Sequence, residues 1–149
     1  MDTAGQERFK SINTSYYRKA DCCLLVYDIT ERASFEEIKN YFIEKIKEKC
    51  KKDIQVILLG NKTDLEHKRK IPSEEGANLG LVNNYIFLET SCLKNTNVSD
   101  AFETLIEITN REMIKNKIQN KNEVQSNNIT ISSLKKKDNG INNPNKCGC

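Results

Sequence analysis

The sequence predicts an α/β fold built around a parallel β-sheet. Three short apolar runs carry this prediction, at residues 22–27, 54–59 and 85–88. The first is continuous rather than alternating in polarity, as expected of a strand that is buried on both faces of a parallel sheet, and the second is also expected to be a buried strand. Segments with helical spacing separate the runs. Such strand–helix alternation is typical of parallel sheets, whose ligands bind beyond the carboxyl ends of the strands.

The elements of the first half can be placed in order. A short helix is expected over residues 13–19, ahead of the first strand. After that strand, Ser34 and Glu37 have the spacing of a capping box, which predicts the start of a helix. Apolar residues then recur at helical spacing to about Cys50, so this helix is amphipathic. Its apolar positions are Phe35, Ile38, Phe42, Ile43 and Ile46.

The second half continues the alternation. A helix is expected from Ser73, just after Pro72, and Gly80 is predicted to end it. A last helix follows the third strand, with Asn97 or Ser99 as its N-cap. Its apolar positions include Val98, Phe102, Leu105 and Ile106. From about residue 120 onward Asn, Lys and Ser predominate and periodicity is lost, so no regular structure is assigned there.

Length and charge divide the chain into a domain and a tail. The 149 residues suit one domain, at residues 1–118, followed by a disordered basic tail at residues 119–149. Residues 111–149 hold eight basic and three acidic side chains, a net of +5, within a total of +3 for the chain. A basic tail suits an anionic membrane surface. No aromatic residue lies between the tail lysines and no nucleic-acid motif occurs, so a nucleic-acid partner is not expected. A solvated tail whose charge only keeps it soluble remains an alternative.

Cysteine usage argues against a structural metal site. The six cysteines form no paired CxxC spacing, and the chain has a single histidine. Cys22 and Cys23 lie in an apolar run, where cysteine usually behaves as a small buried hydrophobe. No signal peptide and no apolar stretch near the roughly 20 residues of a membrane span are present. A reduced, cytosolic protein is therefore expected.

Two motifs follow expected strands. Asn61-Lys62-Thr63-Asp64 comes after the second strand, and Glu89-Thr90-Ser91-Cys92 comes after the third. A carboxylate such as Asp64 can accept hydrogen bonds from both N1–H and the 2-amino group of guanine, and adenine offers no such pair of donors. Taken alone, the first motif could be a chance match in a chain rich in Lys and Asn.

The motifs together resemble those of a known family. The run Asp2-Thr3-Ala4-Gly5-Gln6-Glu7-Arg8-Phe9 resembles switch II of the Rab family of small GTPases, within the Ras superfamily and the P-loop NTPase fold. Asn61–Asp64 resembles the guanine-recognition motif NKxD, and Glu89–Cys92 resembles the ETSAK loop. Cys92 stands in place of Ala, and Leu93 in place of Lys.

The resemblance implies a role for each guanine-site residue. It implies that Asp64 binds the base edge, that the Lys62 stem lies over the base plane and that Asn61 ties the base to the phosphate loop. It also implies that the backbone of Ser91, Cys92 and Leu93 binds guanine O6. Leu93 retains an apolar contact but not the lysine charge.

The phosphate side of the site is implied at the amino end. There Asp2 resembles the residue that holds Mg²⁺ through a water, Gly5 the glycine that contacts the γ-phosphate, and Gln6 the catalytic glutamine that orients the attacking water. The expected ligands are therefore GTP or GDP with Mg²⁺. The pattern GxxxxGK[ST] does not occur in this sequence.

The missing pattern predicts a truncated fold. We expect the P-loop GTPase fold without its first three strands and its P-loop, truncated before switch II. The strand at residues 22–27 would then be an edge strand with unpaired backbone hydrogen-bonding groups on one side. The 149-residue form alone is therefore expected to be poorly stable, inactive and without measurable GTP binding.

The carboxyl end implies lipidation. Cys147-Gly148-Cys149 resembles the C-x-C ending on which Rab proteins carry two geranylgeranyl groups, and two lipid chains give stable anchoring. A pair of free surface thiols is the alternative. The resemblance implies a cytosolic face of an intracellular membrane, with cycling to the cytosol. It also implies effectors, an exchange factor, an activating protein, a dissociation inhibitor and prenylation machinery as partners. Residues 20–26 look like the late-endosomal branch.

Two functional hypotheses follow. In the first, the product is a complete Rab-type GTPase that binds and hydrolyses GTP as a switch in vesicle transport, and this sequence is an incomplete gene model that lacks an upstream coding segment. In the second, the short chain is genuine. It is then a non-catalytic interaction module that could still be prenylated, or a degenerate gene copy unable to bind GTP.

Overall fold

We describe the protein from a computed structural model, which describes the backbone of residues 14–135 and the side chains of residues 17–119. The chain divides into two units, residues 1–110 and residues 111–149. This division falls a few residues before residue 118, where the sequence predicts that the domain ends. The domain boundary at residue 118 stays a prediction.

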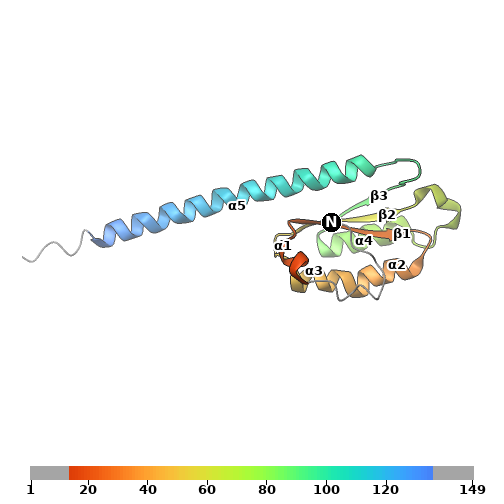
Figure 1. Ribbon diagram of the computed structural model, residues 1–149, viewed down its shortest axis with the longest axis horizontal. Coiled ribbons are helices and arrows are strands. Elements are labelled where there is room, and N and C mark those ends of the chain that lie inside the picture. The colour runs from red at the N-terminus through yellow and green to blue at the C-terminus, as the bar shows by residue number, and fades with distance from the viewer. Residues whose placement is uncertain (1–13, 136–149) are drawn as a thin grey trace, which may run out of the picture. The chain divides into compact units, whose positions relative to one another are not determined.

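The first unit contains a three-stranded parallel sheet. Its strands are β1 (Cys22–Asp28), β2 (Gln55–Asn61) and β3 (Ile86–Glu89), in the order β1-β2-β3 (Figure 1). Both neighbouring pairs are parallel. The α/β fold class and all three predicted strands are confirmed. Each strand extends one or two residues past the end of its apolar run, so polar residues occupy the last strand positions.

Helices connect the strands. A continuous helical segment follows β1 and consists of α2 (Arg32–Glu37), a π-helical turn η2 (Ile38–Phe42) and α3 (Ile43–Lys49). A 3₁₀ segment, η3 (Thr63–Lys68), and α4 (Ser73–Asn83) connect β2 to β3. The sequence pattern did not predict η3, because its short polar run has no periodicity. A short helix, α1 (Thr14–Lys19), precedes β1, as predicted.

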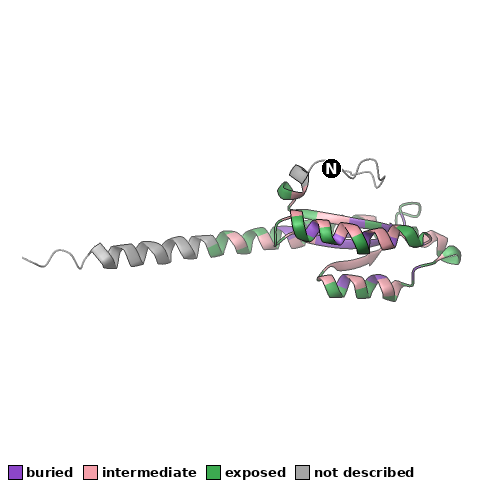
Figure 2. Ribbon diagram, turned by 90° about the horizontal axis from the view of Figure 1, so that it is seen from below, coloured by how far each residue is buried: buried purple, intermediate pink, exposed green. Residues whose placement is uncertain are grey.

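Apolar side chains cover both faces of the sheet. On one face, Leu25, Tyr27, Val56 and Leu58 pack with helix residues that include Phe35. On the other, Ile57 and Leu59 pack with Ala101 and Leu105 of α5 (Val98–Lys135). Figure 2 shows the buried residues along the strands and the inner sides of the helices. This two-sided burial explains why the strands read as continuous apolar runs.

Two predicted helix ends are wrong. Glu31, not Ser34, is the N-cap of α2, and its side chain accepts a hydrogen bond from Ala33 N. Ser34 lies inside the helix. There its hydroxyl donates to Glu31 O and accepts from Asp28 N. Gly80 does not end α4. The helix ends at Asn83 and is capped by Asn84, which adopts the left-handed conformation with φ 57°.

Gly80 is inside α4 for a packing reason. A Cβ at this position would lie 3.0 Å from Tyr85 O and 3.2 Å from Phe87 Cβ. The glycine therefore allows α4 to approach the start of β3 closely.

The last helix runs further than its apolar periodicity. Its backbone is helical from Val98 to Lys135, whereas no regular structure was expected beyond about residue 120. The carbonyl of Asn97 accepts the first helical hydrogen bond, from Ala101 N. The Asn97 side chain instead donates to Glu89 O, so it ties the helix start to β3 rather than capping the helix. Within the described residues, no helix is long and apolar enough to cross a membrane.

Candidate functional site

The polar ends of the strands meet at one edge of the sheet. Asp28 and Asn61 are register partners at the ends of β1 and β2, and Gly60 pairs with Glu89 at the end of β3. Because all three strands are parallel, the loops that follow them leave the same edge. This edge is where an open parallel α/β sheet binds its ligands.

Gly60 leaves room for the Tyr27 side chain beside β2 at this edge. A Cβ on Gly60 would lie 2.9 Å from the Tyr27 hydroxyl oxygen. After Asn61 the chain turns sharply through Lys62, whose φ of 72° lies in the left-handed region. This turn starts η3 directly above the end of the strand.

Backbone and side-chain bonds tie the two predicted guanine loops together. Thr63 N and Oγ1 both donate to Thr90 O, at 3.1 and 3.2 Å. Asn61 Oδ1 accepts from Thr90 Oγ1 at 3.3 Å and from Cys92 N at 3.4 Å. Asn61 is therefore a brace between the loops.

Asp64 and Ser91 are in direct contact. The Ser91 hydroxyl donates to Asp64 Oδ1 at 2.5 Å, and it accepts from Lys94 N at 3.1 Å. Ser91 is fully buried and forms a two-bond bridge with Thr96. These bonds hold Ser91 in place, so the Asp64 carboxylate is oriented by a rigid partner. None of the ion pairs between described residues involves Asp64.

Lys62 pairs with Asp28. Its Nζ lies 2.6 Å from Asp28 Oδ2, while Asp28 Oδ1 accepts from Thr30 N at 2.8 Å and from Thr30 Oγ1 at 2.7 Å. Burial of the Asp28 carboxyl opposes its ionisation, but the hydrogen bonds from Lys62 and Thr30 outweigh burial and lower its pKa. The hydrogen bond and charge of Asp28 raise the pKa of Lys62.

Cys92 and Leu93 lie on the surface of the second loop. Cys92 is exposed, and 82% of Leu93 is exposed. An apolar side chain as exposed as Leu93 is free to contact a ligand at this edge.

Arg69 connects the end of η3 to the end of β3. Its guanidinium contacts Glu66 through Nε and Nη2, both at 2.7 Å, and Glu89 through Nη1 at 2.7 Å and Nη2 at 3.1 Å. Nη1 also donates to Ile71 O at 3.0 Å. Hydrogen bonds to both carboxylates raise the pKa of Arg69.

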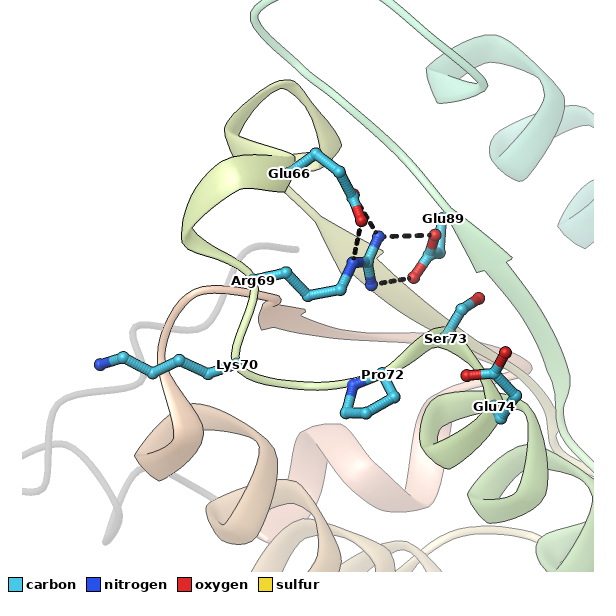
Figure 3. A pocket seen from close by; sticks show the side chains of 7 residues that line it. All are labelled: Glu66, Arg69, Lys70, Pro72, Ser73, Glu74 and Glu89. Carbon is cyan, nitrogen blue, oxygen red and sulfur yellow. Dashed lines mark hydrogen bonds and ion pairs between the residues drawn. The ribbon is translucent and has the colours of Figure 1, made fainter.

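A hollow of about 520 Å³ opens beside this cluster (Figure 3). It is lined by Glu66, Arg69, Lys70, Pro72, Ser73, Glu74 and Glu89. The hollow contains none of the predicted guanine-site residues. The guanidinium of Arg69 in this hollow is already paired with Glu66 and Glu89.

Two residues at this edge of the sheet were not predicted as site residues from the sequence. Asp28 and Arg69 contact guanine-motif residues, yet neither belongs to a recognisable motif. For Asp28 a signal was available, because a carboxylate directly after a buried strand lies at the ligand edge of a parallel sheet. Arg69 has no comparable signal, since its position depends on the turn at the end of η3.

The remaining predicted residues lie outside the described part of the chain. They are Asp2, Gly5, Gln6, Cys147 and Cys149. Within the described part, no group of three or more His, Cys, Asp and Glu side chains could hold a metal ion. A Mg²⁺ site therefore stays a prediction that depends on Asp2.

The chemistry of these groups suits the edge of a purine. The Asp64 carboxylate accepts a hydrogen bond from Ser91, whose loop is tied to Asn61 through Thr90 and Cys92. They lie at the edge where a parallel sheet binds its ligands, and their role in guanine recognition stays a prediction.

Comparison with known proteins gives the same class. Residues 1–111 match the Ras family, and the chain belongs to that family. It is 49% identical over 104 residues to Ras-related protein Rab-13 of Canis lupus familiaris, covering 70% of this chain and 51% of the relative. It is also 49% identical over 104 residues to Ras-related protein Rab-8B of Pongo abelii, covering 70% of this chain and 50% of the relative.

A plant relative extends the match along the chain. Ras-related protein Rab11D of Nicotiana tabacum is 38% identical over 135 residues, covering 90% of this chain and 60% of the relative. The Rab resemblance is thus confirmed, and the chain spans about half the length of the first two relatives. The late-endosomal branch and the truncation stay predictions.

Proposed function

We propose that this chain is part of a Rab-type small GTPase that binds and hydrolyses GTP as a switch in membrane traffic. One observation carries the proposal. Asn61, Lys62, Asp64 and Ser91 are brought together at the carboxyl edge of the sheet, with Ser91 Oγ 2.5 Å from Asp64 Oδ1. Residues from two separate loops meet there, so their proximity is a property of the fold and not of one sequence motif.

The described residues account for base recognition. Asp64 would accept the N1–H and 2-amino donors of guanine, and the half-exposed Lys62 stem would cover the base. Asn61 already joins the two loops through its contacts with Thr90 and Cys92. The backbone of the second loop, with exposed Leu93 beside it, would contact the O6 side of the base.

The phosphate side rests on the family resemblance. Asp2 would hold Mg²⁺ through a water, Gly5 would contact the γ-phosphate and Gln6 would orient the attacking water. When bound, the metal would supply charge stabilisation at the phosphates. GTP and GDP are the proposed ligands, and an exchange factor and an activating protein are the proposed regulators.

Membrane attachment is proposed for the carboxyl end. Prenylation of Cys147 and Cys149, next to a basic tail, would anchor the protein on the cytosolic face of an intracellular membrane. Effectors, a dissociation inhibitor and prenylation machinery are the corresponding partners. These proposals rest on the residues at the end of the sequence and on the Rab relatives.

A second candidate function is a non-catalytic interaction module, prenylated or not, or a degenerate copy unable to bind GTP. The observation in its favour is that, among the described residues, β1 pairs with β2 alone.

The cellular protein can decide between the two. We would isolate it with an antibody raised against residues 73–84, measure its intact mass and identify any bound nucleotide by ion-exchange chromatography. The GTPase proposal expects close to one equivalent of GDP or GTP per chain. A 149-residue species that carries no nucleotide, and does not take up GTP in the presence of Mg²⁺, would favour the interaction module.

A further inference from the structure

Two carboxylates act on Lys62. Its ammonium pairs with Asp28 at 2.6 Å, and the negative charge of Asp64, two residues on, also acts on it. In the proposed function Asp64 must remain available to the donors of a guanine base. The Lys62 ammonium could therefore compete with a guanine base for the Asp64 carboxylate.

The Asp28 carboxylate is fixed so that it can hold this lysine. Thr30 donates two hydrogen bonds to Oδ1, which leaves Oδ2 directed to Lys62. The Asp28 backbone is fixed as well, because its N–H donates to Ser34 Oγ at 3.0 Å and its register partner is Asn61. About 20% of the Asp28 side chain is exposed, so water competes only weakly for it.

Asp64, in contrast, accepts from a neutral group. Its described hydrogen bond comes from the Ser91 hydroxyl on Oδ1, and no ion pair between described residues includes it. The two carboxylates thus divide the available partners: the cation goes to Asp28 and the hydroxyl goes to Asp64.

We propose that Asp28 is a positioning residue that holds the Lys62 ammonium away from Asp64 and so keeps Asp64 open to guanine. The inference rests on the proposed function. Without Asp28, the carboxylate that still attracts Lys62 is Asp64, and a base would have to displace the lysine before it could bind. With Asp28 in place, the lysine stem is held beside the base site while its charge is neutralised elsewhere.

The first test is structural and needs no ligand. The 149-residue chain and its Asp28→Asn variant are compared by NMR or crystallography. Asparagine keeps an oxygen for Thr30 but loses the charge. We expect Lys62 Nζ to move to the Asp64 carboxylate in the variant. If Lys62 Nζ stays away from Asp64, the inference is overturned.

Two further variants keep this test decisive. Asp21→Asn is the matched control, because Asp21 lies before the opposite end of β1 and pairs with Lys51 at 2.5 Å. It should leave Lys62 in place. If Asp28→Asn does not fold, Thr30→Val retains the Asp28 charge and loses one of the bonds that orient it. It should then shift Lys62 partly toward Asp64, and an unmoved Lys62 would count against the inference.

The second test measures base binding with guanosine, which needs no phosphate site. Guanosine is titrated into ¹⁵N-labelled chain, with adenosine as the comparison. Asp28→Asn should weaken guanosine binding roughly fivefold, about the worth of one ion pair that must be broken. Adding Lys62→Met should restore affinity, because the competing cation is gone. A double variant as weak as Asp28→Asn would overturn the inference. A wild-type chain that binds no guanosine would argue against base recognition by this chain, while the structural test would still decide the role of Asp28.

Discussion

The side chains of Arg69 and Glu89 meet in a two-point ion pair, with Nη1–Oε1 at 2.7 Å and Nη2–Oε2 at 3.1 Å. Glu89 is the last residue of β3 and the first of the motif that contains Ser91. Arg69 follows η3, which contains Asp64. The pair therefore connects the two segments from which the candidate guanine site is built.

We expect Arg69→Lys to lower the free energy of unfolding by about 1–3 kcal/mol. Lysine cannot reproduce the planar fork that reaches Glu66 and Glu89 together. Only 16% of the Arg69 side chain and 22% of that of Glu89 are exposed, so the lost contacts are not replaced fully by water. Urea unfolding measures the change. Lys51→Gln removes the exposed pair with Asp21 and should cost less than about 1 kcal/mol. Equal costs would contradict this role for Arg69.

Tyr27→Phe should leave stability at neutral pH unchanged or slightly increased. The Tyr27 hydroxyl is buried and has no hydrogen-bond partner within the described residues, so its removal relieves an unpaired polar group. Urea unfolding at pH 7 of both proteins checks this. A loss of more than about 1 kcal/mol would point to a hydrogen bond that the structure does not contain.

The same variant should flatten the alkaline decline in stability. Burial, with a contribution from the charge of Glu89, raises the pKa of Tyr27 from 10.0 to about 12. The unfolded chain therefore loses this proton first, and the stability present below pH 10 falls as the pH rises toward 12. Burial likewise raises the pKa of Cys23 from 9.0 to about 12, which lowers stability in both proteins over pH 9–12. The difference between the two unfolding curves isolates Tyr27, and identical slopes above pH 10 would refute the assignment.

Gly76→Ala should destabilise the protein by about 1–3 kcal/mol through overpacking. A Cβ on Gly76 would meet the Tyr27 hydroxyl and lie 2.6 and 2.7 Å from the Phe87 ring. This clash exceeds the gain of up to about 1 kcal/mol that alanine brings to a helix interior. Thermal or urea unfolding measures the net effect.

A second substitution identifies the source of that cost. Combining Gly76→Ala with Tyr27→Phe removes the hydroxyl, and it should recover part of the loss in a double-mutant cycle. Additive effects would mean that Phe87, rather than the hydroxyl, resists the new methyl group.

Leu93→Ala should leave stability within about 0.5 kcal/mol, because the side chain is 82% exposed. If Leu93 covers a guanine base, the substitution should weaken guanosine binding about fivefold, equivalent to some 40 Å² of apolar contact at roughly 25 cal/mol/Å². NMR titration with guanosine measures both site and affinity. Leu81→Ala is the control, since Leu81 is 76% exposed on α4. Equal affinities in the two variants would exclude a base contact by Leu93.

The strands could be predicted from the sequence because two-sided burial leaves a direct pattern. Ile57 and Leu58 are fully buried on opposite faces of β2, so neither position could be polar. Helix ends were harder to predict, because one residue type serves several purposes. Gly80 provides close packing to β3, whereas Asn84 adopts the left-handed conformation that ends the helix.

The motifs of the candidate site could be predicted from the sequence, but the residues that hold the motif side chains in place could not. Asn61, Lys62, Asp64 and Ser91 occur in recognisable runs, and the fold brings them together. The Asp28–Lys62 pair depends on the alignment of β1 with β2, which brings together two segments that are far apart in the sequence, so neither motif alone indicates it.

Strand order has a consequence for how this unit folds. The spatial order β1-β2-β3 repeats the order along the chain, and register partners such as Cys22 and Gln55, or Ile57 and Ile86, lie only about 30 residues apart. Each crossover can close soon after its second strand leaves the ribosome, without waiting for a distant segment. We therefore expect the sheet to grow stepwise during synthesis from β1 toward β3, with short loop closures setting the rate.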